Sequence, residues 1–316
     1  MKYATIFEKY RDSGLLERVK QYSKWTIPSV AAVDIHKMSP NSSMEVAGDY
    51  QSDGATLVST LSSKLSGLLF PTTHPFLRIP LEKEVKEAIA TYTEFDLEQV
   101  EDDCARIENE ACSRLFLNSS YSQIIASLNH LIITGNVCIY RDSNTSRLIA
   151  YGLNSYVTRR DALGRVTDAV IKERVTFGDL PESLKYHLIE EYGSKYKEED
   201  IVEKYLDLYT RIKLTTMGEN RGYQITQELD GDRLPIEGWY RENRCPYIFP
   251  VWDYISGENY GRGLVEKHAG SFATVSELSE ALLLYKIEAL RLINVAAPGG
   301  ASDIDELVTA DVGEWV

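Results

Sequence analysis

The feature that most constrains this fold is an apolar stripe of helical period between Arg262 and about Ile293. Apolar side chains recur there every three to four residues, which is the spacing of one face of an α-helix. At 1.5 Å per residue the predicted helix is roughly 48 Å long. Few single domains of this size bury so long a stripe, so we expect the helix to pack within a bundle or between subunits. The stripe consists of Leu264/Val265, Ala269, Phe272, Val275, Leu278, Leu282, Tyr285, Ala289 and Leu292/Ile293.

A glycine-rich stretch, GENYGRGLVEKHAG from Gly257 to Gly270, leads into this helix. Glycine-rich turns before a helix often hold phosphate. The spacing of the glycines shows whether this stretch matches a known phosphate-binding pattern. The Walker pattern fails because Gly261 is followed by Arg262 and Gly263, with no Lys-Ser or Lys-Thr pair. The dinucleotide pattern fails because Glu266 stands where a small residue is needed, and its carboxylate would repel pyrophosphate. The stretch favours a kinked start of the helix, with Gly261 and Gly263 allowing close backbone approach, over nucleotide binding.

No other group of residues predicts catalysis, a cofactor or a metal. The sequence GLNSY lacks the closing glycine of a nucleophile elbow after Ser155. The five histidines are scattered without metal-ligand spacing, and the four cysteines contain no C-x-x-C pair. We therefore expect no enzyme, no cofactor and no metal site.

Charge narrows the classes of partner. With 34 basic and 48 acidic residues, the formal net charge of −14 argues against a tight, sequence-independent grip on nucleic acid. The segment Glu82–Glu110 holds 11 acidic and 3 basic residues. An acidic docking face or a metal cluster is an alternative there, but the pattern favours the solvated side of a helix pair. Leu115–Tyr140 is uncharged but rich in polar residues, which favours a buried helix followed by a strand over a membrane span.

The order of patterns predicts an α+β fold, with helices first and an antiparallel meander second. A core-facing helix is expected after Ser52-Asp53-Gly54 and before Pro71, with its repeat on Leu57, Leu61, Lys64/Leu65 and Leu68/Leu69. Strands are expected in NVCIY, on both sides of the loop Asp161–Gly164, and in IVEKYLDLYTRIKLT, GYQITQEL and CPYIFPVWDY, with a short helix between Pro181 and Gly193.

Six segments, in this order, resemble the portal (head-to-tail connector) proteins of short-tailed, autographivirus-type phages. Each segment alone is weak evidence for this family, but six segments in the same order across some 250 residues are specific for it. The segments are QYSKWTIPS (Gln21–Ser29), SSKLSGLLFP (Ser62–Pro71), TGNVCIY (Thr134–Tyr140), LNSYVTRRDALGRV (Leu153–Val166), RCPYI (Arg244–Ile248) and GENYGRGLVEKHAGSF (Gly257–Phe272).

The resemblance implies a non-enzymatic ring, of twelve subunits in this family, at one capsid vertex of the virion, assembled in the host cytoplasm. It implies a wing domain over 1–256, a first stem helix over 257–294 and the start of a clip over 295–316. The partners implied are the terminase large subunit, the scaffold and major capsid proteins, the tail adaptor, and duplex DNA that passes through without sequence-specific binding. The stem and oligomer interface would include Tyr260, Gly261, Gly263, Leu264, Phe272, Val275, Leu278, Leu282 and Tyr285.

The sequence departs from the family pattern at its end. Family members continue with the rest of the clip, a second stem helix, a returning wing segment and a crown, whereas this sequence stops at TADVGEWV. We therefore expect the N-terminal part of a portal, which puts ring closure and channel constriction in doubt. Two other readings stay open, namely another virion protein, such as a tail adaptor or an internal core protein, and a nucleotide-dependent enzyme.

Overall fold

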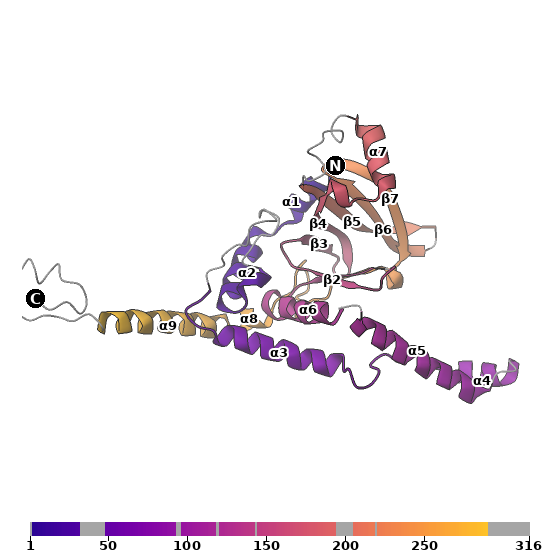
Figure 1. The fold of residues 1–316 in the computed structure, drawn as a ribbon, viewed down its shortest axis with the longest axis horizontal. Helices are drawn as coiled ribbons and strands as arrows, with labels where there is room; N and C mark the ends of the chain where they lie inside the picture. Colours follow the sequence, from indigo (N-terminus) through magenta and orange to yellow (C-terminus); the bar gives the residue numbers. More distant parts are fainter. Residues whose placement is uncertain are drawn as a thin grey trace, which may run out of the picture.

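A five-stranded antiparallel sheet forms the centre of the body (Figure 1). The computed structural model describes residues 2–31, 48–92, 96–117, 120–142, 144–193, 205–218 and 220–289. Each strand pairs with the next one along the chain, as expected for a meander. The strands are β3 (Tyr156–Arg160), β4 (Val166–Thr176), β5 (Tyr205–Met217), β6 (Asn220–Leu229) and β7 (Asp232–Arg241).

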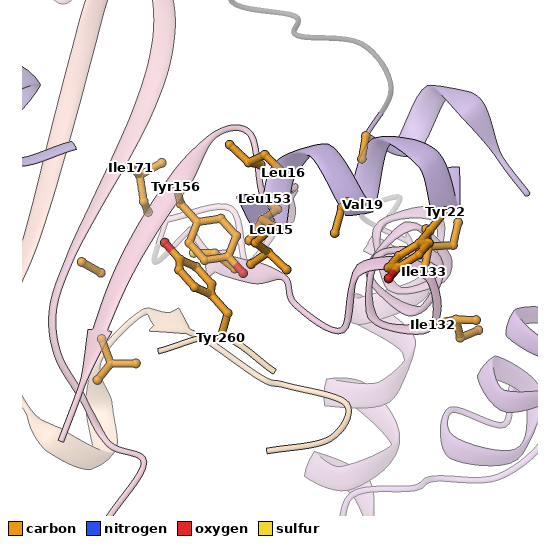
Figure 2. Packing of buried hydrophobic residues seen from close by; sticks show 14 of the residues in the cluster. Leu15, Leu16, Val19, Tyr22, Ile132, Ile133, Leu153, Tyr156, Ile171 and Tyr260 are labelled. Atoms are coloured by element: carbon orange, nitrogen blue, oxygen red, sulfur yellow. The ribbon is translucent and has the colours of Figure 1, made fainter. Parts of the chain in front are cut away.

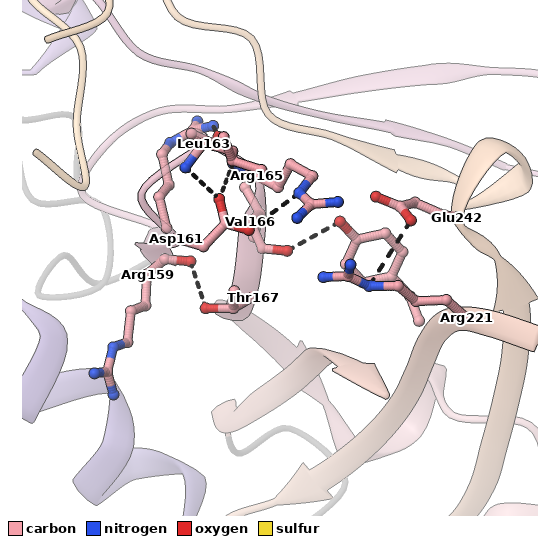
Figure 3. Close-up of polar contacts among 11 residues, drawn as sticks. Arg159, Asp161, Leu163, Arg165, Val166, Thr167, Arg221 and Glu242 are labelled. Atoms are coloured by element: carbon pink, nitrogen blue, oxygen red, sulfur yellow. Dashed lines mark hydrogen bonds and ion pairs between the residues drawn. The ribbon is translucent and has the colours of Figure 1, made fainter. Parts of the chain in front are cut away.

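The hairpin between β3 and β4 turns at the predicted loop. Gly164 has a φ of +79°, a conformation that glycine adopts without strain. The Asp161 carboxylate accepts hydrogen bonds from both the backbone and the guanidinium of Arg165, and these hold the loop closed (Figure 3). From β6, two strands further along the sheet, the Tyr223 hydroxyl donates to the Val166 carbonyl at 2.9 Å. Side chains thus reinforce the register that the backbone ladder sets.

A second, three-stranded antiparallel sheet has the order β2-β1-β8. Ile139 of β1 pairs with Ala150 on one side and with Ile248 on the other. Sequentially distant segments therefore meet at β1, directly after the end of α6. The strands are β1 (Cys138–Arg141), β2 (Leu148–Tyr151) and β8 (Tyr247–Ile248).

The helices surround these sheets and extend beyond them. In Figure 1, α4 and α5 project from one end of the body and α9 from the other. No helix in the described ranges is long and apolar enough to cross a membrane. The helices are α1 (Tyr3–Tyr10), α2 (Ser13–Trp25), α3 (Asp53–Leu69), α4 (Lys83–Tyr92), α5 (Leu97–Leu117), α6 (Ser120–Thr134), α7 (Glu182–Tyr192), α8 (Leu264–Lys267) and α9 (Ala269–Ala289), with 3₁₀ turns at Pro28–Val30, Phe177–Asp179 and Glu242–Arg244.

Helix α1 is fixed to the large sheet by buried polar contacts. The Tyr3 N–H donates to both carboxylate oxygens of Glu228 at 3.1 Å, and the Tyr3 hydroxyl bonds Thr226 at 2.6 Å. Under the same helix, Arg211 on β5 pairs with the buried Asp168 on β4 at 2.7 Å. Because each buried charge has a partner, the apolar side of α1 packs on the sheet without an unpaired carboxylate.

The main hydrophobic core joins α2 and α6 to both sheets. Val19, Ile132 and Ile133 are almost fully buried in it, and the rings of Tyr156 and Tyr260 lie side by side next to Leu15 (Figure 2). A second cluster lies under α7, and a third lies under α1. The main core thus connects the beginning of the chain with the residues just before α8.

Most of the predicted architecture is confirmed. The fold is α+β, and the helix after Ser52, the acidic helix pair, the buried helix ending before Gly135 and the helix before Gly193 are all present. Strands β2 and β7 were not predicted. Pro235 and Gly238 lie within β7, and both residues are uncommon inside strands. Strand β7 is an edge strand, where proline is tolerated.

Two predictions about helices need correction. The expected single helix from Arg262 begins at Leu264 and is interrupted at His268, where φ is −111° and ψ is 15°. The predicted leucine repeat of α3 is only partly its packed face. Leu61 and Leu65 are half-buried against the main core. Leu57 is 61% exposed, and Leu68 is also exposed. The buried positions are Gly54, Val58, Ser62 and Ser66, because α6 crosses α3 on the side where small residues permit close approach. Residues 290–316, which include the end of the predicted stem and the whole predicted clip, lie outside the described residues.

Candidate assembly surface

The glycine-rich stretch before α8 is held inside the body by Asn136. This side chain lies just after α6 and is 1% exposed. Its amide accepts from the Gly261 N–H and donates to the Gly261 carbonyl, both at 2.7 Å, and also donates to the Thr134 carbonyl at 2.8 Å. The Gly261 N–H is therefore engaged within the chain. This arrangement supports the structural interpretation of the glycines over phosphate binding.

Three glycines allow the two backbones to meet at this corner. A Cβ on Gly263 would lie 2.5 Å from the Ile133 carbonyl oxygen, and a Cβ on Gly261 would lie 2.6 Å from Val251 Cβ. Gly135 has a φ of +77°, and a Cβ there would lie 2.3 Å from the Arg262 carbonyl carbon. The close approach predicted for Gly261 and Gly263 is present, and its partner is the α6–β1 corner of the same chain.

Tyr260 lies in the main core beside this corner. Its hydroxyl accepts from the Thr158 N–H at 3.2 Å and donates to the Tyr10 carbonyl at 3.3 Å. Burial raises the pKa of the phenol to about 12. Tyr260 therefore ties the start of the chain, β3 and the glycine stretch together.

Arg262 and Lys267 fix α8 to this corner by ion pairs. Arg262 bridges Glu258 at 2.9 Å and Glu266 at 2.7 Å, and Glu258 is the larger cause of the raised pKa of this guanidinium. Lys267 pairs with Asp253 at 2.6 Å. With Val265 buried, the short helix α8 is anchored on both its polar and its apolar side.

Beyond His268, α9 leaves the body. Figure 1 shows it projecting past α2 and α3, away from both sheets. Ser276 donates to Asp49 at 2.6 Å, and the Tyr50 hydroxyl bonds Glu280, which raises the pKa of this phenol. Both of these contacts lie near the middle of α9, at its eighth and twelfth residues.

From Val275 onward, α9 exposes apolar side chains around its circumference, and a few charged residues lie between them. Leu282 is 57% exposed, and residues three to four apart from it as well as residues adjacent to it are exposed too. A helix that is apolar all round is typical of a buried environment. The described residues of one copy provide no such environment for this segment. The exposed side chains are Val275, Leu278, Leu282, Leu283, Leu284, Tyr285 and Ile287.

A groove of about 660 Å³ lies between α3 and α8–α9. Leu57, Leu61 and Lys64 of α3 line one wall. Phe272 and Val275 of α9 line the other, near the buried Ile132 at α6. The groove is open and mostly apolar, and it adjoins the exposed part of α9.

The predicted interface residues fall into three groups. Tyr260, Gly261 and Gly263 are buried within the chain, so their contribution to an interface stays a prediction and would be indirect. Leu264 and Phe272 are half-buried and line the groove. Val275, Leu278, Leu282 and Tyr285 are exposed.

The wall formed by α3 was missed in the sequence. Its leucines at helical spacing were assigned to the core, although the parallel series of small residues Gly54, Ser62 and Ser66 offered a second candidate for the packed face. Among the described residues no group of three or more His, Cys, Asp or Glu side chains could hold a metal ion.

Comparisons with known proteins agree on one family. The family model for the bacteriophage head to tail connecting protein matches residues 2–307. The portal protein of Pseudomonas phage phiKMV is 36% identical over 313 residues, which are 99% of this chain and 59% of that protein. The portal protein of Escherichia phage T7 is 29% identical over 306 residues, covering 95% of this chain and 54% of that protein. The portal protein of Enterobacteria phage SP6 is 25% identical over 318 residues, covering 100% and 59%. The chain thus spans between about half and three fifths of the length of these relatives.

Proposed function

This chain belongs to the bacteriophage head to tail connecting protein family, and on that premise we propose that it is a portal subunit that assembles into a ring-shaped DNA conduit at a capsid vertex. The observation that carries the proposal is the all-round apolar surface of α9. Such a helix needs neighbours on more than one side, whereas the hydrogen bonds that the described residues of one copy make to it reach only as far as Glu280. Copies arranged around a rotation axis give each helix two different neighbours, which can cover the exposed apolar side chains.

We assign the wing to residues 1–256, the first stem helix to 257–294 and the start of the clip to 295–316. The anchored corner at Gly261 supports the first boundary, because it holds α8 against the body while α9 projects from it. Asp49, which accepts a hydrogen bond from Ser276, and Tyr50, which bonds Glu280, support α9 near its middle. The stem would thus be a helix that the wing holds at one end.

The conduit would let duplex DNA pass without gripping it. Between Arg262 and Ala289 there are three basic residues, Arg262, Lys267 and Lys286, and four glutamates. The net charge of the whole chain is −14. Affinity for the DNA backbone comes from Lys and Arg that displace counterions, so this surface favours weak, salt-sensitive contact. Packaging, tail attachment and ejection all require that DNA moves through.

We propose that the ring binds the terminase large subunit, the scaffold and major capsid proteins, and the tail adaptor, as the portal resemblance implies. A non-enzymatic role fits the glycine stretch, in which the Gly261 amide is bonded to Asn136. The ring would be a component of the virion.

Negative-stain electron microscopy of the purified gene product tests this proposal. We expect wide-winged rings with a central hole. Uniform monomers or filaments without rings would contradict the proposed function. Incubation with ATP, GTP or NAD serves as a control, because a rise in melting temperature of several degrees would instead favour a nucleotide-dependent enzyme.

A further inference from the structure

We infer that the groove between α3 and α8–α9 receives the exposed half of α9 from a second copy of this chain, so that α3 is the acceptor surface of a head-to-tail contact. The inference rests on the proposed ring function and adds the partner surface to it. Four exposed or half-exposed residues on one side of α3 are here named the α3 strip: Leu57, Leu61, Lys64 and Leu68. The first three line the groove, and Leu68 continues the strip beyond it.

The α3 strip has the spacing of a helix-packing ridge. Its members follow at intervals of four, three and four residues, so they lie on one side of α3, next to the face that packs on α6. Leu57 is 61% exposed although it borders the main core. An apolar ridge beside an open groove of about 660 Å³ is the shape that a further helix fills.

The donor surface on α9 matches the α3 strip in length. From Leu57 to Leu68, α3 runs about 17 Å, and from Leu278 to Ala289, α9 runs about the same distance at 1.5 Å per residue. The two surfaces lie at different places on one chain, since the groove contacts only the first turns of its own α9. Contact between two unlike surfaces of identical copies is heterologous, and repeated heterologous contacts form a ring when the rotation between neighbouring copies closes.

Charge also favours this occupant. The α3 strip carries one charge, the cation of Lys64, at its centre. Beyond Val275, α9 carries Glu277, Glu280 and Glu288 against the single cation Lys286. Opposite charges at the rim of an apolar contact favour one register and disfavour pairing of α9 with a second α9 through like charges.

Mixing two variants tests the inference. The groove variant carries Leu57→Asp and Leu68→Asp, and the helix variant carries Leu278→Asp and Leu282→Asp. All four side chains are exposed, so both variants should fold. Placing two carboxylates in the contact should weaken association on the order of 100-fold or more in each variant. Leu163→Asp, at an exposed leucine of the β3–β4 loop, is the matched control and should associate like the wild type.

Sedimentation velocity and native mass spectrometry give the readout. Each variant alone should stay a 35.8 kDa monomer, whereas a 1:1 mixture should form a dimer that grows no further, because only the α9 of the groove variant and the groove of the helix variant remain intact. If the wild type associates but the groove variant associates equally well, or the mixture stays monomeric, this inference is overturned and the ring stands on another contact. If this chain without substitutions stays monomeric at tens of micromolar, and electron microscopy of the full-length gene product shows no rings, the proposed function fails as well.

Discussion

The two ends of the segment Gly257–Ala289 differ in how well the described residues of one copy bury them and pair their polar groups. At the first end, Gly261 is buried and hydrogen-bonded on both its N–H and its carbonyl. At the second end, α9 has leucines around its whole circumference and exposes them. Eight residues separate the last buried glycine, Gly263, from the half-buried Phe272, so the change is abrupt.

The difference indicates which part of the segment folds with the chain and which part depends on assembly. Backbone groups buried at the corner would be costly to leave unpaired, and the body pairs them itself. The exposed leucines of α9 contribute little to the stability of one copy, because burial and not composition produces the hydrophobic free energy. Substitutions at the two ends should therefore separate stability from association.

The largest effect on stability is expected at Gly263. Replacing it with valine places a Cβ 2.5 Å from the Ile133 carbonyl and 2.8 Å from the Ile132 carbonyl, and backbone atoms at the end of α6 have little room to shift. We expect Gly263→Val to lower the free energy of unfolding by about 4 kcal/mol or more. Urea denaturation followed by circular dichroism measures the change.

Gly270→Ala is the matched control, since a Cβ at Gly270 meets nothing within 4 Å. Alanine in a helix is favoured over glycine, so this variant should be neutral or more stable by up to about 1 kcal/mol. Equal destabilisation by both variants would show that the corner is not the restrained end of the segment.

A smaller effect, dependent on pH, is expected at His130. This side chain packs under Gly152 on the α6 side of the same body, and burial lowers its pKa from 6.5 to about 4. Below pH 6.5 the unfolded chain takes up a proton that the folded chain does not accept until about pH 4, so the folded state loses stability as the pH falls through this window. The loss attributable to His130 is on the order of 3 kcal/mol between these limits.

The measurement compares the wild type with His130→Gln in urea at several pH values. The acidic residues titrate in both proteins, so the difference between the two curves isolates the histidine. As the pH falls from 6.5 towards 4, the free energy of unfolding of the wild type should decrease more than that of His130→Gln. Parallel curves over this range would mean that His130 is solvated in the folded protein.

The sequence predicted the order of helices and strands well, but it predicted poorly which face of a helix packs against the body. The α+β order, the turn at Gly164 and the buried helix before Gly135 follow from periodicity and from glycine conformation, which are local properties. The orientation of α3 depends on which side α6 crosses, and that is a long-range choice between a leucine ridge and a small-residue ridge. Strand β7 was missed because it contains Pro235 and Gly238, which have low strand propensity. An edge strand such as β7 tolerates them.

The candidate interface was partly predictable for the same reason. The apolar period located Val275, Leu278, Leu282 and Tyr285, which are exposed. It could not show that Tyr260 turns into the core, because the hydroxyl's partners, Thr158 and Tyr10, are about 100 and 250 residues away in sequence. A buried tyrosine and an interface tyrosine have the same local pattern.

The smallest effect on stability is expected at Leu282, and it gives the sharpest test of the comparison. At a dilution where the protein is monomeric, Leu282→Ala should change the free energy of unfolding by no more than about 0.5 kcal/mol, because its side chain is 57% exposed in one copy. Leu188→Ala in α7 is the matched control, since Leu188 is fully buried and such truncations cost about 2–5 kcal/mol. At a concentration where the wild type associates, the two variants should differ in the opposite sense. Leu282→Ala should weaken self-association, whereas Leu188→Ala should leave the self-association of its folded fraction unchanged. If Leu282→Ala destabilised the monomer as much as Leu188→Ala, the end of α9 would be packed within its own chain, and the contrast between the two ends of the segment would be lost.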